Sequence, residues 1–173
     1  MSAKILNGKE FAARWRKEIA AEAAALKRDR DVVPGLGVVL VGDDPASLSY
    51  VSAKERACAE AGFESREHRL PEQATQDQVL AVVEALNRDP AIHGILVQLP
   101  LPPHICETAI VEAIDPAKDV DGFTPVNVGR MLIGQPCFLP CTPHGIVRLL
   151  MDAGIATEGR HAVVVGRSNI VGK

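Results

Sequence analysis

The sequence is poor in aromatic residues and has no excess of basic charge. Among its 173 residues are four Phe, one Trp and one Tyr, and the formal net charge is -3 at pH 7. Proteins that bind nucleic acid usually present a basic surface, and those that bind single strands add aromatic rings on which bases stack. We therefore expect no nucleic-acid partner for this chain.

Long apolar stretches and a cysteine framework are also missing. No run of about 18 apolar residues is present to span a bilayer, and the N-terminus lacks the apolar core of a secretory signal. We therefore expect a cytoplasmic protein with no membrane partner. The spacing of the cysteines shows no disulfide framework in a chain of this length, so we expect reduced thiols. These cysteines are Cys58, Cys106, Cys137 and Cys141.

What the sequence does contain is an alternation of helix-like and strand-like patterns. Apolar residues three and four positions apart predict amphipathic helices, and continuous apolar runs predict strands that are buried on both faces. In chain order we predict a helix up to the charged run 27–31, a strand at 36–41, a helix at 45–61, an edge-like strand at 65–70, a helix at 75–87 and a strand at 92–99.

This alternation predicts an α/β fold, with a mostly parallel sheet in a three-layer domain. The middle of the chain reads as loops with a short helix within 105–114. Thr142 followed by Pro143 predicts the N-cap and first residue of a helix that ends at Asp152. A further buried strand is predicted at 161–165, directly before a glycine.

Tyr50 and Lys54 are the first candidate pair for chemistry. Four residues apart on the predicted helix 45–61, they share one face, with about 5–6 Å between their Cβ atoms. A lysine acts as acid or base near neutrality where its pKa is depressed, and a neighbouring tyrosine can orient it. The alternative is a surface lysine beside a half-buried tyrosine. Gln98 ends a predicted strand, where its amide can bind a substrate and the lysine, or merely cap exposed backbone.

The segment 115–122 supplies three carboxylates in a turn. Its spacing does not match a calcium-binding EF-hand, so we expect no calcium site. Asp121 either accepts hydrogen bonds from an amide-like or guanidine-like edge of a ligand or forms an Asx turn. Cys137, Cys141 and His144 lack a fourth ligand spaced to complete a tetrahedral site, so no metal is predicted.

The last residues have the pattern of a dinucleotide-binding turn. Gly166 to Gly172 follows the predicted strand 161–165, and its glycines would let the backbone approach a pyrophosphate. The spacing differs from G-x-G-x-x-G and is a weak signal by itself. Arg167 suits a 2′-phosphate, which favours NADP over NAD.

Five blocks, in order along nearly the whole chain, resemble one family. It is the family of bifunctional methylenetetrahydrofolate dehydrogenase/methenyltetrahydrofolate cyclohydrolases of one-carbon metabolism. The blocks are VGDDPAS with SYVSAK at 41–54, HGILVQLPLP at 93–102, KDVDGF at 118–123, PCTP at 140–143 with Gly145, and GRSNIVG at 166–172.

The resemblance implies a fold, a function and an assembly. It implies an N-terminal folate-binding catalytic domain over 1–122, connecting loops and a linker helix over 123–158, and the beginning of a Rossmann-like NADP-binding domain over 159–173. It also implies oxidation of methylenetetrahydrofolate to methenyltetrahydrofolate with NADP, and hydrolysis of the product to formyltetrahydrofolate. Full-length members commonly form homodimers.

The same resemblance implies roles for single residues. Lys54 would be the principal catalytic residue of the hydrolysis, and Tyr50 would line the folate pocket and orient it. Gln98 would hydrogen-bond the lysine, and Asp121 would bind the pterin ring. The implied catalytic residues are Lys54, Tyr50, Gln98 and Asp121; the implied substrate contacts add Val97 and Leu99; the implied cofactor contacts are Gly166, Arg167 and Ser168.

Full-length members of this family continue well beyond the last residue of this chain. We therefore expect either poor order after about Gly159 or a chain that is the first part of a longer protein. A folate-binding fragment that is non-catalytic, or active only as a cyclohydrolase, remains an alternative. Short-chain dehydrogenases also pair Tyr and Lys four residues apart, but their glycine-rich turn precedes the pair, the reverse of the order here.

Overall fold

A computed structural model describes residues 5–168 and 171 of the chain. Its sheet has three parallel strands in the order β2-β1-β3, so the α/β prediction with a parallel sheet is confirmed. The polar strand β2 lies at the edge, as its alternation predicts. The strands are β1 (Gly35–Val41), β2 (Glu64–Leu70) and β3 (Gly94–Val97).

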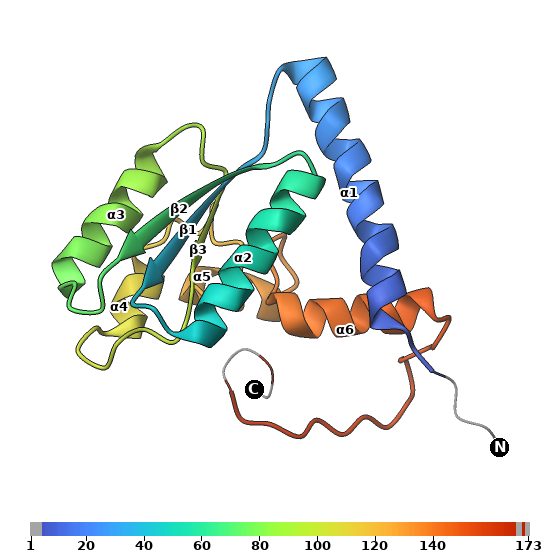
Figure 1. Ribbon diagram of the computed structural model, residues 1–173. Helices are drawn as coiled ribbons and strands as arrows, with labels where there is room; N and C mark the ends of the chain where they lie inside the picture. The colour runs from blue at the N-terminus through green and yellow to red at the C-terminus, as the bar shows by residue number, and fades with distance from the viewer. Residues whose placement is uncertain (1–4, 169–170, 172–173) are drawn as a thin grey trace.

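Helices cover both faces of this sheet (Figure 1). One apolar cluster joins β1 and β3 to α3 and α4, around Val39, Val83 and Ile110. The other cluster lies on the opposite face, where Val51 of α2 packs against Leu40. The three layers of the prediction are therefore present. The helices are α1 (Gly8–Arg30), α2 (Pro45–Glu60), α3 (Gln76–Arg88), α4 (Glu107–Glu112), α5 (Pro125–Leu132) and α6 (Cys141–Asp152).

Side-chain caps explain where α2 and α3 begin. Asp44 accepts a hydrogen bond from the backbone N–H of Ser47 at 2.8 Å, which caps α2 as predicted. Thr75 and Gln78 form a reciprocal capping box at α3. Such caps satisfy backbone N–H groups that have no partner within the helix. The first turn of α2 is thereby fixed directly after the carboxyl end of β1.

Three local predictions were wrong or incomplete. The loop-rich middle contains α5, whose N-cap Thr124 stands before a proline. Helix α6 begins at Cys141, so Thr142 is not its N-cap. Residues 161–165 form no strand, and Val165 is 95% exposed. A strand is stabilised by pairing, and no strand lies beside this segment within the described residues.

Helix α1 meets α6 at one end of the molecule (Figure 1). The ring of Trp15 lies edge-on to His144, with ring centroids 6.1 Å apart, and the guanidinium of Arg148 is 5.2 Å from its centroid. Arg14 forms an ion pair with Asp152. These contacts attach α6 to the N-terminal helix.

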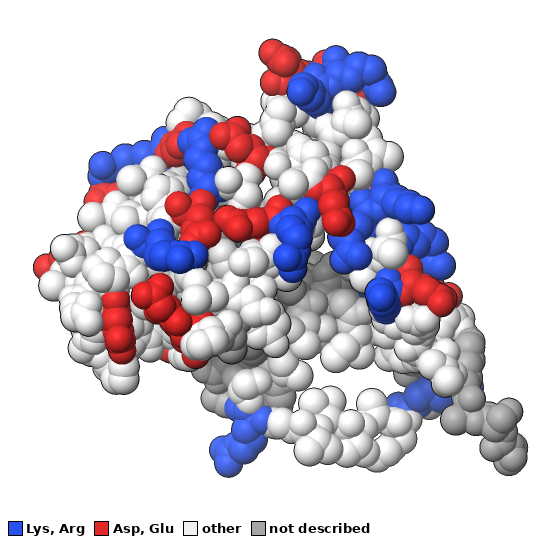
Figure 2. Space-filling view, viewed as in Figure 1, with Lys and Arg blue, Asp and Glu red and all other residues white. Residues whose placement is uncertain are grey.

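The surface carries both signs of charge. Figure 2 shows Lys and Arg interleaved with Asp and Glu over the face formed by α2, β2 and α3. Part of this pattern comes from ion pairs along β2, where Arg66 pairs with Glu64 and Arg69 with Glu67. None of the helices within residues 5–168 has the length and apolar character needed to cross a membrane.

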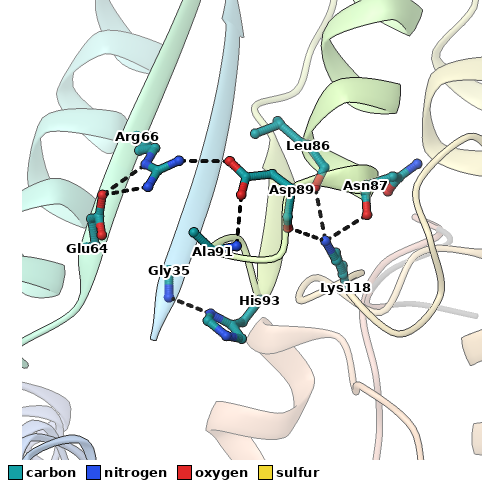
Figure 3. Close-up of polar contacts among 9 residues, drawn as sticks. All are labelled: Gly35, Glu64, Arg66, Leu86, Asn87, Asp89, Ala91, His93 and Lys118. Carbon is teal, nitrogen blue, oxygen red and sulfur yellow. Dashed lines mark hydrogen bonds and ion pairs between the residues drawn. The ribbon is translucent and has the colours of Figure 1, made fainter. Parts of the chain in front are cut away.

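A polar network closes the amino-terminal end of the sheet (Figure 3). The ammonium of Lys118 donates to the backbone carbonyls of Leu86, Asn87 and Asp89 at 3.1, 2.7 and 2.9 Å, and so caps the carboxyl end of α3. The Asp89 carboxylate also pairs with Arg66 of β2 at 2.8 Å. This network fixes α3 and the segment around Lys118 relative to the sheet.

We predict that Lys118→Met lowers the free energy of unfolding by about 2 kcal/mol, because three carbonyls at the end of α3 lose a charged donor. Urea unfolding followed by circular dichroism measures this loss. Lys17→Met, at an exposed position of α1, is the matched control and should change stability by less than about 0.5 kcal/mol. Equal stabilities of the two variants would contradict a role for the Lys118 network.

Candidate active site

Lys54 and Gln98 meet at the carboxyl-terminal edge of the sheet. The ammonium Nζ of Lys54, on α2, donates to Oε1 of Gln98 at 3.0 Å. The Gln98 amide Nε2 donates to the Leu99 carbonyl at 2.7 Å, which fixes the end of the amide that faces the lysine. The two residues lie 44 positions apart in sequence, so it is the parallel pairing of β1 and β3 that brings them together.

Tyr50 lies one turn before Lys54 on α2 and is 64% exposed. Its hydroxyl makes no hydrogen bond within the described part of the chain. An exposed ring beside an anchored lysine is available to contact a flat ligand. The predicted role of Tyr50 in a folate pocket remains a prediction.

The segment after Lys118 runs beside β3 as a short parallel extension of the sheet. The Ile95 N–H donates to the Lys118 carbonyl at 2.7 Å, and Ile95 forms a parallel bridge with Asp119. Because the segment continues in the direction of β3, Asp121 emerges at the same edge as Gln98.

Asp119 is a buried carboxylate that holds the loop after this segment. Its oxygens accept hydrogen bonds from the backbone N–H groups of Phe123 and Thr124, the Thr124 hydroxyl and the Asn127 amide, at 2.7–3.2 Å. A buried charge needs such compensation. Asp119 therefore ties the Asp121 turn to the start of α5.

Asp121 is half-buried next to the Lys54–Gln98 pair. Burial raises the pKa of its carboxyl above the usual range, and the negative charge of Asp119 adds to this. The positive charge of Lys54 and a hydrogen bond from Cys141 act in the opposite direction. The thiol of Cys141 lies 3.9 Å from Oδ1 of Asp121. Lys54, Gln98, Asp121 and Cys141 thus form one polar group, which we call the sheet-edge site.

The side chains of two residues predicted to contact the substrate are buried or partly buried. Val97 is 5% exposed and belongs to the apolar cluster under α3, so a ligand could reach only its backbone. Leu99 is partly buried against the same cluster. The predicted cofactor residues Gly166, Arg167 and Ser168 lie together in an exposed segment without helix or strand.

A pocket of about 170 Å³ lies between α1 and α6, beside Trp15 and Arg148. Within the described residues, no three His, Cys, Asp or Glu side chains gather closely enough to hold a metal ion. All four cysteines are free.

Sequence reasoning missed Asp119 and Cys141 as parts of this region. Asp119 had a local signal, because Thr124 before Pro125 marks a helix start whose backbone donors need an acceptor. Cys141 had none, since its contact with Asp121 spans 20 positions. The signal for α5 was the same Thr124, which stands before a proline as Asp44 does at α2.

Comparison with known families places these residues in context. Residues 6–121 match the model of the "Tetrahydrofolate dehydrogenase/cyclohydrolase, catalytic domain". The chain belongs to the tetrahydrofolate dehydrogenase/cyclohydrolase family. Residues 140–173 match the NAD(P)-binding domain of the same family. The sheet-edge site contains the last residue of the first match, Asp121, and the second residue of the other, Cys141.

Similar proteins cover the whole chain, but the chain does not cover all of them. It is 58% identical over 173 residues to "Bifunctional protein FolD" of Dehalococcoides mccartyi strain CBDB1, and 58% identical to that of Geobacillus kaustophilus. All of this chain aligns in both cases, with 58% and 61% of the relatives' lengths. The chain therefore spans about three fifths of these curated relatives.

Solved structures share the fold. The FolD methylenetetrahydrofolate dehydrogenase/cyclohydrolase of Campylobacter jejuni aligns with a TM-score of 0.96 at 46% identity, over 99% of this chain and 61% of its own. The enzyme of Trypanosoma brucei, solved with NADP cofactor and inhibitor, aligns with a TM-score of 0.95 at 38% identity, over 99% of this chain and 59% of its own.

We predict that Asp119→Ala lowers the free energy of unfolding by about 3 kcal/mol, because several buried donors lose their acceptor. The midpoint of urea unfolding measures this effect. Asp43→Ala, an exposed aspartate of the β1–α2 loop, is the control, with an expected change below about 0.5 kcal/mol. A stable Asp119→Ala protein would show that the loop does not depend on this carboxylate.

Proposed function

We propose that this chain carries the folate site of a bifunctional methylenetetrahydrofolate dehydrogenase/methenyltetrahydrofolate cyclohydrolase. The single observation that carries the proposal is the 3.0 Å hydrogen bond between Lys54 and Gln98, with Asp121 close enough for the lysine charge to act on its carboxyl. The family match, the order of the motifs and this geometry support the same site. Its reaction class is hydrolysis of a cyclic amidinium carbon in one-carbon metabolism.

Lys54 is proposed to move protons during this hydrolysis. Water attacks the methenyl carbon and forms a C–O bond while Nζ of Lys54, in its neutral amine form, accepts a proton from the water. Collapse of the intermediate then breaks one C–N bond: the Lys54 ammonium returns its proton to the departing nitrogen, and the hydroxyl releases its own proton to solvent as it becomes the formyl oxygen. Gln98 holds Nζ in place through both steps. The Gln98 amide is itself fixed by its bond to the Leu99 carbonyl, so the amide loses little conformational freedom when it holds the lysine.

Asp121 and Tyr50 are proposed to position the folate. The carboxylate of Asp121 can accept two N–H donors from the amide and amine edge of a pterin, and its partial burial strengthens such bonds. The exposed ring of Tyr50 supplies a flat apolar surface next to the lysine. Leu99 and the backbone of Val97 complete the proposed substrate contacts.

The dehydrogenase activity with NADP is proposed for the whole protein. The types of residue at Gly166, Arg167 and Ser168 suit a dinucleotide phosphate, and residues 140–173 match an NAD(P)-binding domain. Within residues 5–168 this segment is exposed and forms neither helix nor strand. No hydride-transfer step is assigned to it. Homodimer formation and a cytoplasmic location are likewise proposed for the full-length protein.

We predict that Lys54→Met reduces the rate of methenyltetrahydrofolate hydrolysis by about 10²- to 10⁴-fold, because proton transfer is lost. Lys54→Arg should be impaired to a similar degree, since arginine keeps the charge but cannot release its proton. The loss of absorbance of the methenyl compound measures the rate, above the spontaneous background.

The control for this experiment is Lys17→Met, which should retain the wild-type rate. Oxidation of methylenetetrahydrofolate with NADP is followed in parallel. A hydrolysis rate that survives Lys54→Met would contradict the proposed role of the lysine. Binding of folate without any Lys54-dependent rate would identify the alternative, a non-catalytic folate-binding fragment.

We predict that folate binding weakens as the pH falls through a midpoint above the ordinary pKa of aspartate, because Asp121 binds as the carboxylate and burial raises its pKa. Calorimetric titration with 5-formyltetrahydrofolate between pH 4 and 8, roughly the range where carboxyl and imidazole groups titrate, measures this midpoint. Lys54→Met should move it to higher pH, since the lysine charge lowers the Asp121 pKa. A midpoint unchanged by Asp121→Asn would assign the titration to another group.

A further inference from the structure

Cys141 contacts the loop that carries Asp121. Its sulfur lies 3.6 Å from the Val120 carbonyl and 3.9 Å from Oδ1 of Asp121, so the S–H group has two acceptors in reach. Cys141 is the first residue of α6, and its thiol makes no cap at that helix. The thiol therefore points its one donor at the sheet-edge site and not at its own backbone.

A close backbone approach fixes this contact. Gly122 has a φ of +66°, and a Cβ atom there would lie 2.7 Å from the Phe138 carbonyl oxygen and 3.0 Å from the Pro140 nitrogen. Only glycine allows both the conformation and the approach. The loop after Asp121 and the residues before α6 are thus packed against each other, which leaves Cys141 at a defined position.

Charged groups of the sheet-edge site also act on the pKa of the Cys141 thiol. Although Cys141 as a residue is exposed, its sulfur is partly covered, and this burial raises the pKa of the thiol, to which the Asp121 carboxylate adds. Lys54 lowers it, and Asp119 raises it slightly. In the other direction, the bond from the thiol lowers the pKa of Asp121. Cys141 thus favours the ionised form of Asp121.

The contact also joins the two regions of the chain that match different domain models of the family. Asp121 is the last residue of the catalytic-domain match and Cys141 is the second residue of the NAD(P)-binding-domain match. We propose that Cys141 is a positioning residue of the folate site, which holds the Asp121 carboxylate and ties the first turn of α6 to the loop that carries it. This inference rests on the proposed function for its consequence, but the contact can be tested without folate.

The test is the titration of Asp121 by NMR on protein labelled with ¹³C-aspartate, the signal being assigned with Asp121→Asn. Cys141→Val removes the donor and keeps the bulk, so the Asp121 pKa should rise. Cys141→Ser keeps a donor, so the pKa should stay close to that of the wild type. Cys106→Val, at the exposed N-cap of α4, is the matched control and should leave the titration unchanged.

A second arm avoids any change in folding. Methyl methanethiosulfonate caps the thiols of the folded wild-type protein and should also raise the Asp121 pKa. Cys141→Ser treated in the same way keeps the other three cysteines, Cys58, Cys106 and Cys137, and should show no rise. An Asp121 pKa that is the same in wild type, Cys141→Val and capped protein overturns the inference.

Folate binding tests the consequence. Cys141→Val should raise the Kd for 5-formyltetrahydrofolate by about two- to tenfold, and Cys141→Ser by less than about twofold. In an Asp121→Asn background the effect of Cys141→Val should disappear, because the two residues act together. An equal loss of affinity in both backgrounds would overturn the positioning role. A wild-type chain that binds no folate while the Asp121 titration shifts as expected would overturn the proposed function alone.

Discussion

The buried carboxylate of Asp119 is the constraint on which the site depends. Because it is removed from water, this carboxylate needs hydrogen-bond donors, and it accepts hydrogen bonds from the next loop and the first turn of α5. Its backbone is at the same time an extension of the sheet beside Ile95. Sheet, loop and helix therefore share one anchor, and Asp121, two residues later, is placed at the edge where Lys54 and Gln98 meet.

Much of the fold could be predicted because its signals are local. Apolar runs indicated the buried strands, and the cap Asp44 before Pro45 set the start of α2. Helix α5 was hidden by the glycines and prolines around it, although Thr124 before Pro125 repeats the α2 signal. The strand pattern at 161–165 failed for a different reason, since local sequence gives the tendency of a strand but cannot supply the neighbour that pairs with it.

The candidate site likewise contains residues that local sequence signals could place and a contact that they could not. The i, i+4 spacing placed Tyr50 and Lys54 on one helix face, and the parallel sheet rule placed Gln98 at the same edge. The partnership of Asp121 with Cys141 could not be read from the sequence, because it follows from the approach of Gly122 to the residues before α6. The same short segment reaches both edges of the sheet: Lys118 binds the carbonyls at the end of α3 at one edge, and Asp121 lies near Lys54 at the other.

The contact between α1 and α6 gives the chain a built-in spectroscopic reporter. Trp15 is the sole tryptophan of the sequence, and its indole lies against His144 and Arg148 of α6. Its emission therefore responds to the seating of α6, whereas circular dichroism follows the helices and sheet as a whole. Where the two signals diverge during heating or on adding a ligand, α6 has moved relative to α1 while the helices and the sheet have kept their structure.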